Sequence, residues 1–229
     1  EAKAATPKIA ALLAAAALPE PEPVPGVSYN SQGQLLIIGQ AGVAVAWAER
    51  LADQLDVTVL ISGALAGGEL PVTRRYPVFS GQVKSAKGYL GAFDVAWEQV
   101  NPIDLETCTR CNACIEVCPE QAIDYSYQID LDKCKAHRQC VTACGEVGAI
   151  DFNRRDTLRS DRFDLILDLT GKRLFAMHQP PQGYFAPGKD PLDQALAVQQ
   201  LVQLVGEFEK PRFFVYRENI CAHSRSKVS

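Results

Sequence analysis

Runs of apolar residues separated by polar ones divide the chain into a series of predicted elements. Two short aliphatic runs, at residues 34–39 and 57–61, predict buried strands. The apolar face of residues 43–55, which lie between them, predicts a helix. A strand–helix–strand unit implies a right-handed crossover and a parallel pair of strands. An α/β domain with a parallel or mixed sheet is therefore expected in the first half of the chain.

More elements are predicted later in the chain, on both sides of a block that is rich in cysteine. Residues 76–100 carry strand signals around three glycines and predict a meander or hairpin, and the alternation at 163–169 predicts a strand with one wetter face. Asp190 followed by Pro191 predicts the start of a helix. Residues 213–216 predict a final strand. The helix is expected to reach about residue 209, with a buried stripe of Leu192, Leu196, Leu201, Val202, Val205 and Phe208.

The first 26 residues form a separate predicted segment. The apolar run at residues 9–18 predicts an Ala-rich helix, which we favour over a signal peptide because Glu1 is not an initiator residue. Four prolines then alternate with other residues at 19–25, which predicts a stiff polyproline II linker. We expect the chain to be a piece of a longer one, with sequence missing before Glu1 and after Ser229.

Composition narrows the class of protein. The 229 residues carry a net charge of −4 and are 47% hydrophobic, which is typical of a globular protein and argues against a nucleic-acid-binding surface. No apolar run reaches the roughly 18 to 20 residues that a membrane span needs, so we expect a cytoplasmic protein. Seven of the eight cysteines fall between Cys108 and Cys144. One dense run in a chain of this length indicates metal binding rather than disulfides.

The first half of this block has the spacing C-x₂-C-x₂-C-x₃-C-P, from Cys108 to Pro119. This spacing is typical of bacterial ferredoxins. Two-residue spacers allow one tight loop to hold three corners of a cubane iron–sulfur cluster, and its backbone N–H groups point at the sulfur atoms. The fourth cysteine, Cys118, comes three residues later and faces away towards a different cluster.

A shift of 26 residues maps this motif onto Cys134, His137, Cys140 and Cys144. The flanking residues repeat as well, because 122–125 (Ala-Ile-Asp-Tyr) match 149–152 (Ala-Ile-Asp-Phe) with one residue added. The block is therefore an internal duplication.

Residues 103–152, about a fifth of the chain, resemble the bacterial two-cluster [4Fe–4S] ferredoxins. The resemblance implies an α+β fold, in which a duplicated (βαβ)₂ module is inserted in or joined to the α/β domain of residues 27–102 and 153–229. It also implies that the fourth cysteine of each copy crosses over. The first cluster would then be bound by Cys108, Cys111, Cys114 and Cys144, and the second by Cys118, Cys134 and Cys140, with His137 at the fourth place.

The second copy departs from the family pattern at two positions, and the one that matters is His137 in place of cysteine. Three outcomes stay open: a [3Fe–4S] cluster, a [4Fe–4S] cluster with imidazole on the fourth iron, or no second cluster. Imidazole in place of thiolate raises the reduction potential, and the charges of Lys135 and Arg138 further favour the reduced state. The other departure, Gly145 in place of proline, is expected to alter only the turn.

Charge favours electron transfer between proteins. Residues 103–152 hold nine acidic and four basic residues, so the block carries a net charge of −5 and suits a basic redox partner. The leading prediction is a non-catalytic carrier that relays single electrons through two clusters. An accessory part of a redox enzyme is a second prediction, and a zinc-bound structural domain, which C-x₂-C spacing also allows, is a third.

Two weaker signals lie outside the block. The turn Gly39-Gln-Ala-Gly42 hints at a dinucleotide site, but it lacks the G-x-G-x-x-G spacing, and a structural turn is favoured. Cys221 stands apart and is expected to open a further cluster motif beyond Ser229, with a free thiol or a replacement ligand for the second cluster as the alternatives. The sequence from about residue 204 through Cys221 resembles a large bacterial iron–sulfur protein often encoded near formate dehydrogenase, which implies a role beside that enzyme. No nucleophile arrangement is visible.

Overall fold

The computed structural model describes residues 2–18, 26–63, 68–155 and 157–211. The chain divides into two compact units, Glu1–Ser28 with Glu209–Ser229 and Tyr29–Phe208. The proline linker, the predicted strand at 213–216 and Cys221 lie outside the described residues. In the described part, no helix has the length and apolar character needed to cross a membrane.

The first unit contains helix α1 (Ala2–Ala16), which begins and ends earlier than the helix predicted at residues 9–18. Strands β1 (Gly26–Ser31) and β10 (Gly206–Pro211), whose residues are shared between the two units, pair as a two-stranded sheet. The predicted continuation of the last helix to about residue 209 is wrong, because β10 occupies that segment. Gly206 has a φ of 123°, which a right-handed helix does not accept.

The second unit is built on a five-stranded sheet in the order β4-β3-β2-β8-β9. All of its pairings are parallel. Helix α2 (Ala41–Leu51) connects β2 to β3, as the sequence predicted. If these five strands are numbered by their position in the chain, their order across the sheet is 3-2-1-4-5, which is the order of doubly wound α/β folds. The bounds of these strands are β2 Gln34–Gly39, β3 Asp56–Ile61, β4 Val78–Ser80, β8 Leu165–Asp168 and β9 Tyr184–Phe185.

Helices α2 and α5 (Pro191–Val202) are joined by a hydrogen bond from Trp47 Nε1 to Gln194 Oε1 of 2.9 Å. Asp190 caps α5 as predicted, accepting from the Leu192 amide at 2.7 Å. The predicted buried stripe is wrong at Leu192, Leu196 and Val205, which are 68%, 49% and 44% exposed. The buried face of α5 consists of Gln194, Ala197 and Leu201.

An antiparallel sheet of β5 (Gln82–Tyr89), β6 (Ala92–Glu98) and β7 (Leu158–Phe163) packs on the parallel sheet through aromatic and aliphatic side chains. The β5–β6 pair is the hairpin predicted within residues 76–100. Strand β8 is consequently buried along its whole length, so the predicted wetter face is wrong. Asp164 and Asp168 are buried as hydrogen-bond acceptors, for the Gln32 amide and for the Tyr184 hydroxyl.

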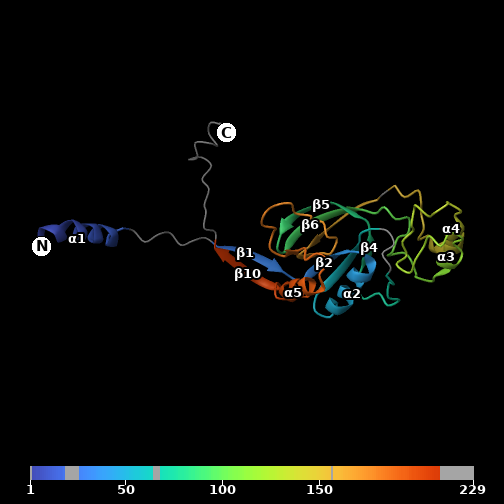
Figure 1. Ribbon diagram of the computed structural model, residues 1–229, viewed down its shortest axis with the longest axis horizontal. Coiled ribbons are helices and arrows are strands. Elements are labelled where there is room, and N and C mark those ends of the chain that lie inside the picture. Colours follow the sequence, from blue (N-terminus) through green and yellow to red (C-terminus); the bar gives the residue numbers. More distant parts are fainter. Residues whose placement is uncertain (1, 19–25, 64–67, 156, 212–229) are drawn as a thin grey trace, which may run out of the picture. The chain divides into compact units, whose positions relative to one another are not determined.

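The cysteine block leaves the α/β domain between β6 and β7. Glu98 pairs with Leu158 at the open end of these two strands, so residues 99–157 leave and return at neighbouring points. The block contains the short helices α3 (Ala113–Glu116) and α4 (Gln139–Cys144), which lie side by side, and the 3₁₀ turn η1 (Gly145–Val147) (Figure 1). Its predicted strands are reduced to two bridges, Ile103↔Ile150 and Ile123↔Ile129.

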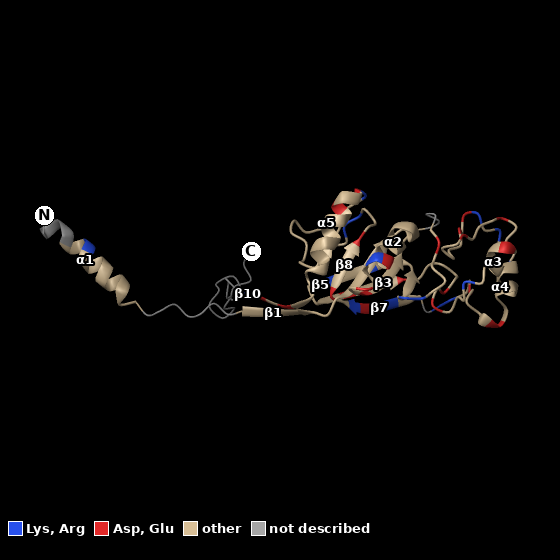
Figure 2. Ribbon diagram, turned by 90° about the horizontal axis from the view of Figure 1, so that it is seen from below, with Lys and Arg blue, Asp and Glu red and all other residues tan. Residues whose placement is uncertain are grey.

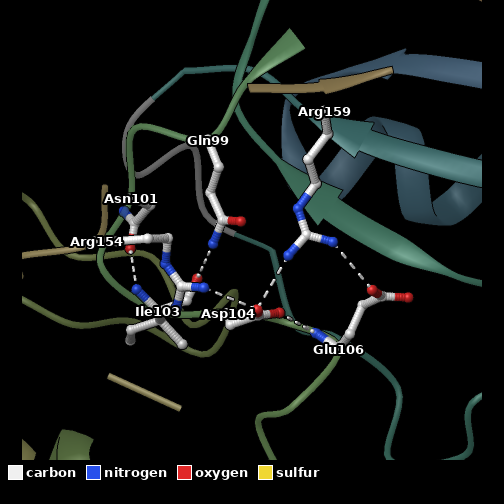
Figure 3. A network of polar contacts seen from close by, with 7 residues as sticks. All are labelled: Gln99, Asn101, Ile103, Asp104, Glu106, Arg154 and Arg159. Atoms are coloured by element: carbon white, nitrogen blue, oxygen red, sulfur yellow. Dashed lines mark hydrogen bonds and ion pairs between the residues drawn. The ribbon is translucent and has the colours of Figure 1, made fainter. Parts of the chain in front are cut away.

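A network of ion pairs ties the start of this block to β7 (Figure 3). One oxygen of Asp104 lies 3.1 Å from Arg154 Nη1 and 3.2 Å from Arg159 Nη2. Arg159 also pairs with Glu106 at 3.4 Å. Arg154 and Arg159 therefore hold the cysteine block against the sheet.

We predict that Asp104→Asn destabilises the protein by about 1–3 kcal/mol, because two half-buried guanidinium groups lose their carboxylate. The repeat offers a matched control in Asp130→Asn. Both carboxylates are similarly buried and accept from a backbone amide two residues later at 3.0 Å, but Asp130 pairs only with Lys133, at 3.7 Å. Guanidinium unfolding of the two variants under anaerobic conditions measures the difference. Equal midpoints would contradict an anchoring role for Asp104.

Candidate metal centres

A first cavity, with an empty volume of about 350 Å³, opens between the two halves of the cysteine block. Its wall contains the four cysteines predicted for the first cluster, Cys108, Cys111, Cys114 and Cys144. The last of these comes from the second copy. Apolar side chains, among them Ile103, Val147 and Ile150, complete the lining.

A second cavity, of about 280 Å³, is lined by the other predicted set. Cys134, His137 and Cys140 come from the second copy, and Cys118 comes from the first. The structure thus brings all eight predicted positions together in two groups of four, and each group takes one member from the opposite copy. Cys221 lies outside the described residues.

Backbone contacts repeat between the two copies. The amide of Asp104 donates to the Ala149 carbonyl, and the amide of Asp130 donates to the Ala122 carbonyl, both at 2.8 Å. The two bridges are related by the same shift of 26 to 27 residues. These contacts cross between the copies, which is why each cavity includes a cysteine of the opposite copy.

The cysteine loops owe their shape to left-handed backbone at non-glycine residues. Arg110 and Asn112 have φ values of 59° and 68°, and their counterparts Ala136 and Arg138 have 59° and 63°. Such conformations are uncommon for residues with a Cβ and often mark functional loops.

This backbone turns amide groups towards sulfur. The Arg110 amide donates to Cys108 Sγ, and the Ala136 amide donates to Cys134 Sγ, both at 3.4 Å. The Ala122 amide donates to Cys118 Sγ at the same distance. Hydrogen bonds of this kind stabilise thiolate sulfur and help to set the potential of a bound cluster.

Thiol groups in the first cavity are crowded. Burial, and next the neighbouring thiols of Cys108 and Cys111, raise the pKa of Cys114 to about 12. Burial also raises the pKa of Cys108 and of Cys140. Cys111 differs, because the Ala113 amide and the Thr109 hydroxyl lower its pKa. Buried thiols of this kind ionise when a metal takes the place of the proton.

His137 lies at the rim of the second cavity, where its side chain is 43% exposed. Its Nε2 lies 3.2 Å from Glu120 Oε1, and Glu120 lines the same cavity. Metal-bound histidines usually donate the second ring N–H to a carboxylate in this way. The donor set of this cavity, three thiols and one imidazole oriented by a carboxylate, therefore fits an iron–sulfur cluster.

Three further residues at these sites carried no signal in the sequence. Tyr127 lines the first cavity, and its hydroxyl lies 2.6 Å from Asn112 Oδ1. Arg74 donates to the Cys108 carbonyl of the first cysteine loop, and Arg110 of that loop donates to the Pro71 carbonyl. Arg74 is distant in sequence, so no spacing could indicate it. Arg110 could have been singled out only by its contrast with Ala136 in the second copy.

Other candidate sites are less developed. Among the described residues, no group of three or more His, Cys, Asp or Glu side chains could hold a single metal ion. The turn at residues 39–42 leads from β2 into α2, and Gly68 closes over it, since a Cβ on Gly68 would lie 2.5 Å from the Gly42 nitrogen. This close packing favours the structural reading of that turn.

Comparison with known families assigns chemistry to the cysteine block. Residues 102–124, which cover the first copy, match the family model described as a 4Fe-4S binding domain. The match establishes that this part of the chain is an iron–sulfur module.

Three characterised proteins are similar to parts of the chain. Pyruvate synthase subunit PorD of Methanothermobacter marburgensis is 38% identical over 60 residues, which cover 26% of this chain and 73% of that protein. An iron–sulfur component of CoB–CoM heterodisulfide reductase from Methanocaldococcus jannaschii is 31% identical over 96 residues, covering 32% of this chain and 14% of its own length. A ferredoxin-like protein in the nif region of Azotobacter vinelandii is 36% identical over 55 residues, which cover 20% of this chain and 60% of that protein. None of the three is named for formate dehydrogenase.

Proposed function

Since this chain belongs to the ferredoxin-like family of 4Fe-4S binding proteins, we propose that it relays single electrons through two clusters between redox protein partners. One observation carries the proposal. Two cavities, each lined by four ligand-type side chains, take their members from repeat-related positions and exchange one cysteine. That arrangement supports a duplicated (βαβ)₂ ferredoxin module whose strands are short.

In this proposal the first cluster is [4Fe–4S], bound by Cys108, Cys111, Cys114 and Cys144. The cluster supplies one-electron chemistry, and the protein supplies position and electrostatics. The amides that donate to Cys108 and Cys134 stabilise the electron-rich state of each cluster. The apolar lining of the first cavity limits the access of water to the buried sulfur atoms of Cys108 and Cys114.

We assign the fourth place of the second cluster to His137, beside Cys118, Cys134 and Cys140. The contact between His137 Nε2 and Glu120 supports this assignment, because it leaves Nδ1 as the nitrogen for iron. Imidazole in place of one thiolate raises the potential of this cluster. This ligand therefore sets the potential of the second cluster apart from that of the same cluster with four thiolates.

A role as part of a larger redox enzyme is the second candidate. Two relatives are named as subunits, one of pyruvate synthase and one of heterodisulfide reductase. The module also sits between two adjacent strands of an α/β domain, so that domain is available to dock a partner. The formate dehydrogenase association belongs to this candidate and rests on the sequence around Cys221 alone.

Metal analysis tests the chemistry directly. Anaerobically purified protein is expected to be brown and to contain about eight iron and eight sulfide per chain, because two [4Fe–4S] clusters are bound. Iron and sulfide assays with absorbance near 400 nm measure this. A colourless protein that holds zinc and no sulfide would show the structural zinc domain instead.

The exchange of cysteines is tested by two matched variants. Cys144→Ala is expected to disrupt the first cluster, although residue 144 belongs to the second copy, and Cys118→Ala is expected to disrupt the second. EPR of reduced samples, with the iron count, identifies which cluster is lost. If each variant damages the cluster of its own copy, the exchange is wrong.

The assignment of His137 is tested by EPR of oxidised and reduced samples. Wild-type protein is expected to show no oxidised three-iron signal, and His137→Ala is expected to produce one, because the fourth iron loses its ligand. His137→Cys should lower the potential of the second cluster by about 100 mV or more. His178→Ala, which removes another exposed histidine, is the control and should change nothing.

A three-iron signal in oxidised wild-type protein that disappears in His137→Cys would contradict the assignment and establish a [3Fe–4S] cluster. Spectra and potentials unchanged in both His137 variants would place His137 outside the ligand sphere.

A further inference from the structure

Two arginines join the first cysteine loop to the α/β domain. Arg110 lies between Cys108 and Cys111, yet its side chain leaves the loop and donates from Nη1 to the Pro71 carbonyl. Arg74, from the connection between β3 and β4, reaches the other way and donates to the carbonyls of Glu106 and Cys108. The contacts are reciprocal, so each segment places one guanidinium group beside the other segment.

The charge of these two groups is not balanced by a nearby carboxylate. In the described part of the chain, neither Arg74 nor Arg110 has an Asp or Glu oxygen within 4.0 Å. The neighbouring Arg75, by contrast, pairs with Glu49 and Asp53. Arg110 is only 7% exposed, and its Nε is buried without a hydrogen-bond partner. Both guanidinium groups border one cavity, which Glu106 also lines, but the Glu106 carboxylate pairs with Arg159.

Arg110 is buried, whereas Arg74 is exposed to solvent, so the cost of an unpaired charge falls mainly on Arg110. A buried cation without a partner loses its hydration and gains nothing in return. Burial, and next the charge of Arg74, lower the pKa of the Arg110 guanidinium, so the two cations also repel each other. Arginine does not escape this cost by losing its proton under ordinary conditions. The structure therefore calls for negative charge next to Cys108.

We propose that Arg74 and Arg110 raise the reduction potential of the first cluster by placing two uncompensated positive charges beside its Cys108 corner. This inference rests on the proposed function, because the anion it invokes is the cluster with its four thiolates. Reduction adds one electron, and therefore one negative charge, to the cluster. Each guanidinium group consequently stabilises the reduced form more than the oxidised form.

The second copy has no counterpart of this arginine pair, and the cations that line its cavity are Lys135 and Arg138 of the loop itself. The counterpart of Arg110 is Ala136, which is exposed. The α/β domain thus acts on one cluster of the pair through Arg74, and the first copy supplies the second charge through Arg110. Both arginines are positioning residues, since they act through the electrostatics of the loop and do not bind iron.

The test is a redox titration of the complete chain under anaerobic conditions, followed by EPR. Arg110→Ala is expected to lower the potential of the first cluster so that its reduced-to-oxidised ratio at fixed potential falls about tenfold, which is 59 mV for one electron. Arg74→Gln is expected to act in the same direction. Arg110→Lys keeps the charge and should stay within about threefold of wild type.

Two control variants show which cluster a change in reduction potential belongs to. His137→Cys alters the second cluster and so identifies which titration step belongs to it. Arg162→Gln removes an exposed arginine from the outer face of β7 and should move neither step. Iron and sulfide analysis of every variant confirms that both clusters are present before potentials are compared.

The proposal is overturned if Arg110→Ala and Arg74→Gln both keep their iron and leave the reduction potential of the first cluster unchanged. It is also overturned if the potentials of both clusters change equally. If Arg110→Ala loses the first cluster, the potential measured for Arg74→Gln tests the proposal, because Arg74 lies outside the cysteine loops. Absence of iron and sulfide from the wild-type protein would instead refute the proposed function. The two failures are therefore distinguishable.

Discussion

Four thiol groups line one cavity, and the negative charge of their thiolate forms must be stabilised by the rest of the cysteine block. Cys108 and Cys114 are buried, and their thiols resist ionisation next to one another. Thiolates can occupy this position only if positive charge and hydrogen-bond donors surround them. The left-handed loops turn backbone amides towards sulfur, and Arg74 and Arg110 stand close by without carboxylate partners among the described residues. Loop shape, thiol burial and uncompensated cations are thus parts of one arrangement that becomes favourable when iron replaces the protons.

The pairing of the two copies determines where the thiols lie. The bridge Ile103↔Ile150 joins the start of the first copy to the end of the second, and Ile123↔Ile129 joins the remaining two ends. Neither cavity is complete within one copy, so the block is expected to form as a unit. Its ends meet where Glu98 pairs with Leu158, and Asp104 ties the block to Arg154 and Arg159. An inserted module of this kind adds to the α/β domain without breaking either of its sheets. Figure 2 shows acidic positions on the loops around α3 and α4, which agrees with the net charge of this block.

The sequence was informative where local spacing determines structure. Cysteine spacing and the 26-residue repeat indicated the eight ligand positions, and the resemblance to two-cluster ferredoxins implied their division into two groups of four. The strand–helix–strand pattern indicated the parallel pair β2–β3. Long-range packing overrode local pattern elsewhere. The alternation at residues 163–169 suggested a wet face, yet Asp164 and Asp168 are buried because an antiparallel sheet covers β8. Glu120 and Arg74 could not be predicted, since contacts between distant segments place them, and no periodicity marks such contacts.

The divergence that matters for the two sites lies at positions that the repeated contacts do not use. The contacts that repeat are made by backbone groups, by the paired isoleucines and by cysteine sulfur. Positions 110 and 111 differ from 136 and 137 without disturbing any of these contacts. Side chains at those positions face either iron or the surroundings of the loop, where they affect charge and ligand field. A duplicated module can therefore keep one fold while the surroundings of its two sites diverge, so that each site can be tuned to its own potential.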